Sequence, residues 1–357
     1  MTVELWTAGA GMPGRTASIA RRAEDEGWDG LALVDSQNLA PDPFVHLGLA
    51  AAATSRLGLA TGVTNPLTRH PATMATAIAS VQAESGGRAV LGIGRGDSSL
   101  AHLGLAPASP AAFERYLARL QGYLRGDEVD FEPELDGGRV AAPADSLAMA
   151  GGPKSSRVRW IAAAGPKVPV DVAATGPRVI AIAARRADRI TFAVGSDLER
   201  VRWAIEEVRA ACAAAGRDVG EVGLGAYVPV VVNPDRDAAR SLISGGVASF
   251  ARFSVMHGRV TGPTDDRSRA ALETIHHSYD MDHHFTHGSP QSQDLPAAVV
   301  DSFGIAGPPA YCTERLGELV ELGLTKLVLL GGGIGMDREA ARQSRCLLAA
   351  EVLPALR

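Results

Sequence analysis

The sequence predicts an α/β fold, a (β/α)8 TIM barrel that forms a single domain over residues 1–357. Short apolar runs alternate with amphipathic segments along most of the chain, which is typical of repeated strand–helix units. Counting the runs gives eight strands, each followed by a candidate helix. Several runs end in polar residues and glycines, as the functional ends of barrel strands do. An open doubly wound sheet is the alternative, but such sheets usually contain fewer repeats.

The expected strands are apolar segments at residues 3–7, 31–34, 56–61, 89–93, 168–174, 189–194, 222–232 and 326–330. The fourth has no helical period, which favours a fully buried central strand. Proline near the first helical position marks several helix starts, as at Pro71, Pro110 and Pro177. The expected helices cover 14–26, 71–84, 109–124, 175–186, 197–215, 234–256, 314–322 and 336–353, with a further helix beginning near residue 42.

Two stretches interrupt the alternation of strands and helices. Residues 126–166 are broken by prolines and paired glycines and are expected to be an irregular excursion without a second core. Residues 258–309 are polar and are expected to be a lid. The histidines of this second stretch match no standard metal-site spacing, so no metal is expected; they are His276, His277, His283, His284 and His287.

Composition limits the possible partners. The net charge of −5 and the pI near 6.0 argue against nucleic acid and anionic membranes, which require a basic surface. No run approaches the ~20 apolar residues of a membrane span, and the first residues do not resemble a signal peptide. The three cysteines have neither disulfide-framework nor zinc-site spacing. We therefore expect a cytoplasmic protein that acts on a small molecule.

Common nucleotide and hydrolase motifs are missing from the sequence. There is no GxxxxGK[ST], and after the fourth strand Ser99 stands where GxGxxG requires its third glycine. There is also no Gly-x-Ser-x-Gly elbow, which disfavours a serine hydrolase.

Polar residues at the ends of the strands indicate a site at the mouth of the barrel. Residues 87–99, GRAVLGIGRGDSS, place Arg95 between glycines directly after a buried strand, where it needs a counter-charge from Asp97 or a ligand phosphate. Residues 175–178, TGPR, combine backbone N–H groups at a helix start with an arginine, which favours an anion site. The alternatives are a tight turn in the first stretch and an ordinary helix start with a surface arginine in the second.

Three segments carry a resemblance to a known family: LGLATGVTNPLTRHP at 57–71, GRAVLGIGRGDSS at 87–99, and FGIAGPPAYCTERLGELVELGLTKLVLL at 303–330. The chain strongly resembles the luciferase-like monooxygenase superfamily. More narrowly, it is similar to the branch of deazaflavin-dependent methylenetetrahydromethanopterin reductases. The resemblance implies a barrel that binds a flavin or deazaflavin in its mouth, with the two insertions covering the mouth at the carboxyl ends of the strands. It also implies a homodimer.

The resemblance also implies roles for individual residues. It places a non-prolyl cis peptide at Gly62-Val63, behind the ring of the cofactor, and assigns the ring's polar edge to Thr61, Thr64 and Asn65. It assigns the phosphate to Arg95 with its neighbours Gly94 and Gly96, and to a second loop formed by Gly176, Pro177 and Arg178. The implied acidic residues of the pocket are Glu4, Asp35 and Asp97. Many deazaflavin enzymes have histidine where this chain has Ser36, which leaves FMN open as the cofactor.

The function that we predict is hydride transfer between reduced coenzyme F420 and a small organic substrate, with proton delivery by one of the three carboxylates. One alternative is an FMN-dependent monooxygenase that uses flavin supplied by a partner reductase. The other is a non-catalytic flavin-binding carrier or sensor.

Overall fold

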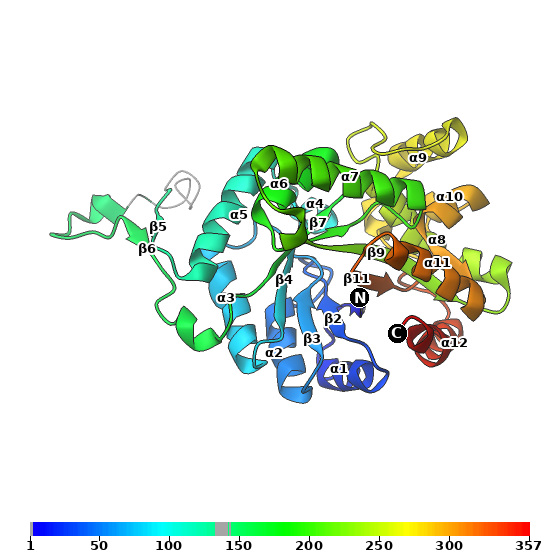
Figure 1. Ribbon diagram of the computed structural model, residues 1–357, viewed down its shortest axis with the longest axis horizontal. Coiled ribbons are helices and arrows are strands. Elements are labelled where there is room, and N and C mark those ends of the chain that lie inside the picture. The colour runs from blue at the N-terminus through cyan, green and yellow to red at the C-terminus, as the bar shows by residue number, and fades with distance from the viewer. Residues whose placement is uncertain (1–2, 133–141, 143) are drawn as a thin grey trace.

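In the computed structural model, which describes residues 3–132, 142 and 144–357, parallel strands close into a barrel (Figure 1). The barrel strands are β1 (Glu4–Gly9), β2 (Gly30–Leu33), β3 (Gly58–Thr61), β4 (Ala89–Ile93), β7 (Val170–Ala174), β8 (Arg189–Phe192), β9 (Gly223–Val232) and β11 (Lys326–Leu330). Each pairs in parallel with its neighbours, and the pairing of β8 with β9 closes the ring. The closed barrel predicted from the sequence is confirmed.

Helices surround this barrel, and they begin where the sequence supplies caps. The outer helices are α1 (Thr16–Asp25), α2 (Pro43–Ala53), α3 (Pro71–Glu84), α5 (Pro110–Arg125), α6 (Pro177–Arg186), α7 (Leu198–Ala215), α11 (Pro309–Glu321) and α12 (Arg338–Leu347). Asp42 and Ser109 accept hydrogen bonds from the first backbone N–H groups of α2 and α5. After α12 the chain stays helical through a π-helical segment, Leu348–Val352, and α13 (Leu353–Ala355).

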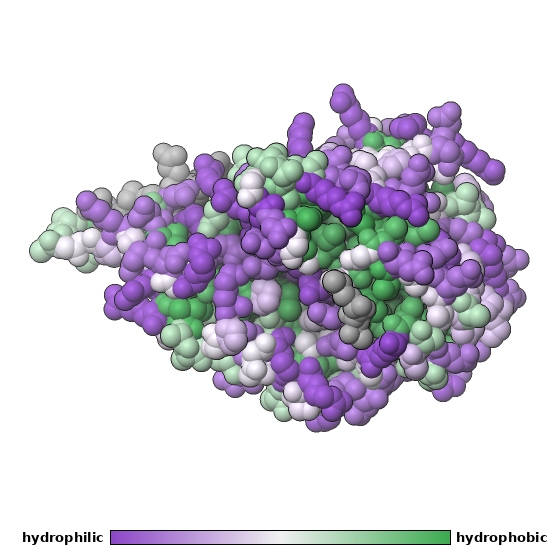
Figure 2. Space-filling view, viewed as in Figure 1, coloured by the Kyte–Doolittle hydropathy of each residue, from purple (hydrophilic) through white to green (hydrophobic). Residues whose placement is uncertain are grey.

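Alternate residues of the strands divide the apolar core into two layers. Outward-facing residues such as Leu31, Leu59 and Leu91 pack against the helices in one cluster, whereas Trp6, Ala32 and other inward-facing residues form a second cluster inside the barrel. The face shown in Figure 2 is mostly hydrophilic at its rim, with apolar side chains recessed between the outer elements. Within the part of the chain that the structure describes, no helix is long and apolar enough to cross a membrane.

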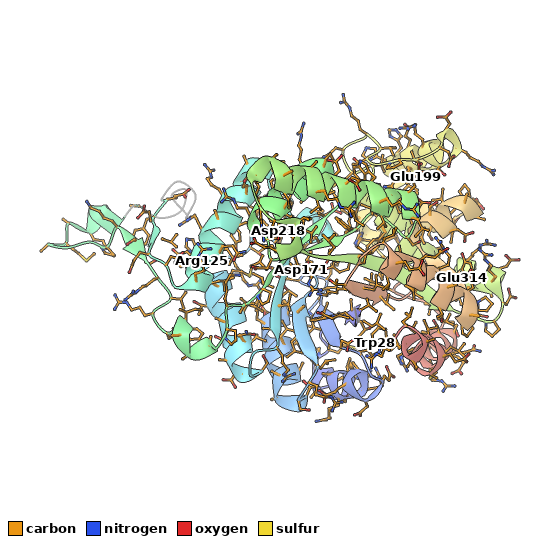
Figure 3. The ribbon with its side chains drawn as sticks, in the orientation of Figure 1. Trp28, Arg125, Asp171, Glu199, Asp218 and Glu314 are labelled. Carbon is orange, nitrogen blue, oxygen red and sulfur yellow. The ribbon has the colours of Figure 1, made fainter. Side chains whose placement is uncertain are left out.

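The interior of the barrel differs between its two ends. At the amino ends of the strands, which we call the amino half, the Trp6 ring fills the space beside Gly30, where an added Cβ atom would lie 2.3 Å from the ring. Lys326 Nζ lies 3.0 Å from Asp171 Oδ2 and 3.9 Å from the centre of a Trp6 ring, and Thr191 donates a hydrogen bond to Asp171. Asp171 lies near the middle of the molecule (Figure 3). Large side chains and paired charges therefore close the amino half.

The excursion at 126–166 does not cover the mouth. It contains a short hairpin of β5 (Val129–Asp130) and β6 (Ser155–Ser156), which projects away from the barrel in Figure 1. The excursion joins the end of α5 to the start of β7, and such helix-to-strand connections lie at the amino ends of barrel strands. The expectation that this excursion lies over the mouth is therefore wrong. Residues 133–141 and 143 lie outside the described residues.

The insertion over the mouth begins earlier than the sequence indicated. It comprises α8 (Arg236–Phe253), α9 (Asp266–Ser278), α10 (Ala297–Phe303) and β10 (Ile305–Gly307), which pairs with the end of β9. We expected the first of these helices, at 234–256, to be an ordinary outer helix. Instead α8 packs on the interior cluster, where Phe250 contacts Tyr227, and the Gly246 N–H donates to the Gly332 carbonyl after β11. The outer position beside α7 is taken by α11.

Candidate active site

Small side chains line the barrel at the carboxyl ends of the strands, which we call the mouth. The inward-facing residues there include Ala8, Ala32, Ala60 and Ala173, from four different strands. Ala8 and Ala173 remain half-buried although they face the barrel axis, so no large side chain covers them. Gly94 lies against Val63, because a Cβ atom at Gly94 would meet the Val63 side chain at 3.3 Å. The mouth is therefore less filled than the amino half.

Asp35 is the centre of a hydrogen-bond network that joins the ends of β2 and β3. Its carboxylate is almost fully buried and accepts hydrogen bonds from Gln37 Nε2, Thr64 Oγ1 and Arg69 Nη1, each at 2.6 Å. Charge-assisted bonds of this kind are stronger than bonds between neutral groups. Ser36, the next residue, is half-buried, and its carbonyl accepts from backbone N–H groups of the following turn. Asp35 thus fixes the loop after β3.

That loop contains the predicted cis peptide bond. The bond between Gly62 and Val63 is cis, as the resemblance implied. The neighbouring polar side chains make internal hydrogen bonds: Thr61 Oγ1 donates to the Gly92 carbonyl at 2.7 Å, and Asn65 Oδ1 accepts from the Leu67 N–H at 3.0 Å. Together with Thr64, these side chains hold the shape of the loop.

Arg95 lies in the loop after β4, at the carboxyl end of that strand. Its Nε atom donates to the Ala108 carbonyl at 2.6 Å, and no carboxylate pairs with its guanidinium within the described residues. Gly96 beside it has a φ of 85°, and a Cβ atom there would lie 2.3 Å from the Leu100 side chain, so this turn requires glycine. Burial, and then the positive charge of Arg178, lower the pKa of the Arg95 guanidinium.

The second arginine comes from the start of α6. Gly176 is the N-cap residue of this helix and Pro177 its first residue, so the backbone N–H groups of the first turn lie beside Arg178. Arg178 is exposed and has no acidic partner within the described part of the chain. Two arginines near one helix start form a positively charged region that favours an anion.

Asp97 connects the β4 loop to the insertion. Both of its carboxylate oxygens pair with the guanidinium of Arg252 near the end of α8, and one of these bonds is 3.0 Å long. The Arg252 guanidinium also lies 4.6 Å from the centre of the Tyr279 ring. The Tyr279 hydroxyl in turn contacts His284 Nδ1 at 2.6 Å. This bridge holds α8 and the loop after α9 beside the mouth.

The histidines of the insertion occupy different environments. His276 and His277 lie on α9, and His283 contacts Asp280, whereas burial lowers the pKa of His284 to about 4. Among the described residues, no group of three or more histidine, cysteine, aspartate or glutamate side chains is arranged to hold a metal ion.

Glu4 lies at the other end of the barrel. It begins β1 opposite Lys326, the first residue of β11, and accepts hydrogen bonds from Trp6 Nε1 at 2.9 Å and Arg189 Nη2 at 3.1 Å. The first residue of a barrel strand lies away from the mouth because all strands are parallel. The expected meeting of Glu4 with Asp35 and Asp97 is therefore wrong, and the structure brings only the two aspartates to the mouth.

Sequence reasoning missed three residues of this region: Arg69, Arg252 and Tyr279. Arg69 falls inside the segment 57–71. Its position after the third strand therefore indicated that it lies near the mouth. The pairing of Arg252 with Asp97 had none, because the two residues are 155 positions apart.

The model of the family described as luciferase-like monooxygenase matches residues 3–326. The chain belongs to this family. One relative is the 5,10-methylenetetrahydromethanopterin reductase of Methanolobus tindarius, which is 27% identical over 92% of this chain and 93% of its own length. Another is a protein of Kineococcus radiotolerans named F420-dependent glucose-6-phosphate dehydrogenase, which is 29% identical over 64% of this chain and 67% of its own length. The family predicted from the sequence is confirmed.

Two solved structures have the same fold as this chain. The coenzyme F420-dependent tetrahydromethanopterin reductase of Methanopyrus kandleri has a TM-score of 0.75 at 24% identity, with both chains fully covered. The FMN complex of the oxygenating constituent of 3,6-diketocamphane monooxygenase from Pseudomonas putida has a TM-score of 0.64 at 18% identity, over 99% of this chain and 98% of the other. These likenesses concern the barrel and not the cofactor.

Proposed function

We propose that this protein is an oxidoreductase that transfers a hydride between reduced coenzyme F420 and a small organic substrate at the mouth of the barrel. Relatives matched over nearly the whole chain are named methylenetetrahydromethanopterin reductase, and a shorter match is named as F420-dependent. When bound, the cofactor supplies the hydride chemistry, and the protein supplies binding, orientation and protons.

The arginine pair at the mouth carries this proposal. Arg95 and Arg178 lie near one another beside the start of α6, without a carboxylate partner in the described residues. A cofactor phosphate supplies the missing negative charge. Ala8 and Ala173 line the mouth and are only half-buried, with no large side chain over them, which suits a flat ring. The residues present therefore fit a phosphorylated flavin or deazaflavin.

The two aspartates at the mouth have different tasks in this proposal. Asp35 has an exposed side-chain fraction of 3% and is held by three donors, so it acts as a positioning residue for the loop after β3. The Asp97 side chain is 14% exposed and is therefore more accessible from solvent. We assign proton delivery to Asp97 and its orientation to Arg252. Ser36, Thr61, Thr64 and Asn65 then shape the cofactor site.

An FMN-dependent monooxygenase is the second candidate function. It is favoured by Ser36, which stands where many deazaflavin enzymes have histidine, and by the monooxygenases in the same family. In this reading a partner reductase supplies the reduced flavin. A flavin-binding carrier or sensor is distinguished from both enzymes by binding without turnover.

The proposal includes a cytoplasmic homodimer without nucleic-acid or membrane partners. The dimer follows from the family resemblance, and the compartment and partners follow from the composition and the net charge of −5. Light scattering of the purified full chain tests the dimer.

Expression in a host that makes both cofactors tests the function. Native mass spectrometry of the purified protein should show bound F420, and oxygen uptake should stay low when the protein is mixed with reduced F420 in air. Bound FMN with rapid oxygen uptake from reduced FMN would support the monooxygenase instead. Stable F420 binding without turnover of a panel of aldehydes, ketones and imines would support the carrier.

A further inference from the structure

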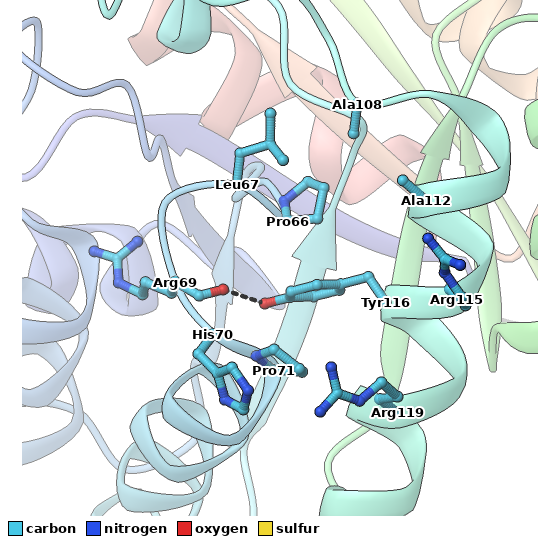
Figure 4. A pocket seen from close by; sticks show the side chains of 10 residues that line it. All are labelled: Pro66, Leu67, Arg69, His70, Pro71, Ala108, Ala112, Arg115, Tyr116 and Arg119. Atoms are coloured by element: carbon cyan, nitrogen blue, oxygen red, sulfur yellow. Dashed lines mark hydrogen bonds between the residues drawn. The ribbon is translucent and has the colours of Figure 1, made fainter. Parts of the chain in front are cut away.

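A cavity of about 320 Å³ lies between the loop after β3 and the first turns of α5 (Figure 4). Its volume is in the lower part of the range for small-ligand sites. Arg115, Tyr116 and Arg119 line it from α5, and His70 lines it from the start of α3. None of the described residues that line the cavity is acidic. We call this cavity the α5 pocket.

The charges of the α5 pocket favour an anionic ligand. Arg115 and Arg119 are four residues apart on one helix, and like charges at this spacing repel one another. Arg119 has a partner in Glu132, with 3.7 Å between Nε and Oε1. Arg115 is exposed and makes no hydrogen bond or ion pair with the residues that the structure describes. Its positive charge is therefore available to a ligand.

The wall of the pocket is rigidly attached to the candidate active site. The buried Tyr116 hydroxyl donates to the Arg69 carbonyl at 2.9 Å, as Figure 4 shows, and burial raises the pKa of Tyr116, so the hydroxyl stays protonated. The Arg69 guanidinium points away from the pocket and holds Asp35. The pocket thus keeps its shape without using the charge of Arg69.

The pocket begins next to the arginine assigned to the cofactor phosphate. Ala108 lines the pocket, its N–H donates to the Arg95 carbonyl at 3.0 Å, and its carbonyl accepts from Arg95 Nε at 2.6 Å. A ligand whose phosphate binds Arg95 therefore has to extend past only one residue, Ala108, to reach the α5 pocket.

We infer that the α5 pocket binds carboxylates of the acidic tail of coenzyme F420. This cofactor carries glutamate residues beyond its phosphate, and carboxylates are natural partners of arginine. FMN ends at its phosphate, so the pocket favours the deazaflavin. The inference rests on the proposed function, because it needs F420 at the mouth.

Equilibrium titration of the full chain at low salt tests the inference, with F420 that carries its glutamate tail and with F420-0, which has no glutamates. The wild type should bind the tailed form about three- to tenfold more tightly. Arg115→Ala should reduce this preference, Arg115→Glu should abolish it, and both should leave the affinity for F420-0 unchanged. The preference of the wild type should shrink as salt is added.

Arg125→Ala is the matched control, since Arg125 ends the same helix and pairs with Asp127 outside the pocket (Figure 3). It removes the same charge and should retain the preference. Equal affinities of the wild type for the two cofactor forms, or a preference that survives Arg115→Glu, would overturn the inference while leaving the proposed function intact. Failure to bind either form would overturn both.

Discussion

The amino half of the barrel interior is filled and its charges are paired, whereas the mouth is lined by small side chains and keeps two arginines without carboxylate partners in the described residues. In the amino half, Lys326 is matched by Asp171 and packs on Trp6. At the mouth, Arg95 has a single carbonyl partner and lies near Arg178. The amino half therefore stabilises the fold, whereas the mouth is built to receive an anion.

The largest effect is expected in the amino half. Lys326→Met removes one partner of a buried ion pair and leaves Asp171 uncompensated, so the free energy of unfolding should fall by about 3–5 kcal/mol in urea titrations. A second change, Asp171→Asn, should restore part of this loss. A loss below about 1 kcal/mol is typical of an exposed pair, and it would contradict the claim that the amino half stabilises the fold.

A substitution of Arg95 at the mouth should weaken cofactor binding without changing the stability of the fold. Arg95→Ala should weaken the binding of F420 by about 1.5–3 kcal/mol, the scale of a charge-assisted hydrogen bond, with little change in Tm. Arg200→Ala should instead lower Tm and leave the F420 affinity unchanged. Arg200 donates hydrogen bonds to the Val194, Pro263 and Thr261 carbonyls inside the protein. An unchanged F420 affinity in Arg95→Ala would place the phosphate elsewhere.

The cover of the mouth should make stability depend on pH. The pKa of His284 falls from 6.5 to about 4 on folding, chiefly through burial, with Asp97 opposing the shift and Arg252 adding to it. The neutral form is therefore favoured in the folded state, and its contribution is lost as the pH falls from 6.5 to 4. We expect a loss of about 1–2 kcal/mol between pH 7 and pH 5 in urea unfolding. His284→Asn should remove this component, and an identical pH profile in that variant would refute the assignment.

The smallest effect is expected at Glu4. Its side chain is partly exposed and pairs with Arg189, so Glu4→Gln should cost less than about 1 kcal/mol of stability. Turnover should be unchanged, because Glu4 lies at the amino half. A large fall in kcat with normal folding would return Glu4 to the active site.

The fold was predictable because parallel strands buried on both faces have a plain apolar pattern. The position of α8 was not predictable, since the apolar face of a helix does not say which surface it covers. Here Val247 and Phe250 belong to the interior cluster and not to the outer layer. Sequence periodicity therefore identified the helix and missed its place.

Local parts of the candidate site were also predictable. Asp35 and Arg95 each lie two residues after the end of a strand, so their place at the mouth comes from the barrel itself. The partners Arg69 and Arg252 come from other segments and depend on tertiary packing. Glu4 was misplaced because the resemblance put it with the pocket, although the first residue of a strand lies at the amino end.

Fluorescence titration of the purified wild-type chain with F420 and with FMN, under identical conditions, tests the central claim most directly. We predict saturable binding of F420 to a single class of sites, with FMN binding far more weakly, and competition by inorganic phosphate. Tight binding of FMN with no binding of F420 would contradict the assignment of the mouth to a deazaflavin.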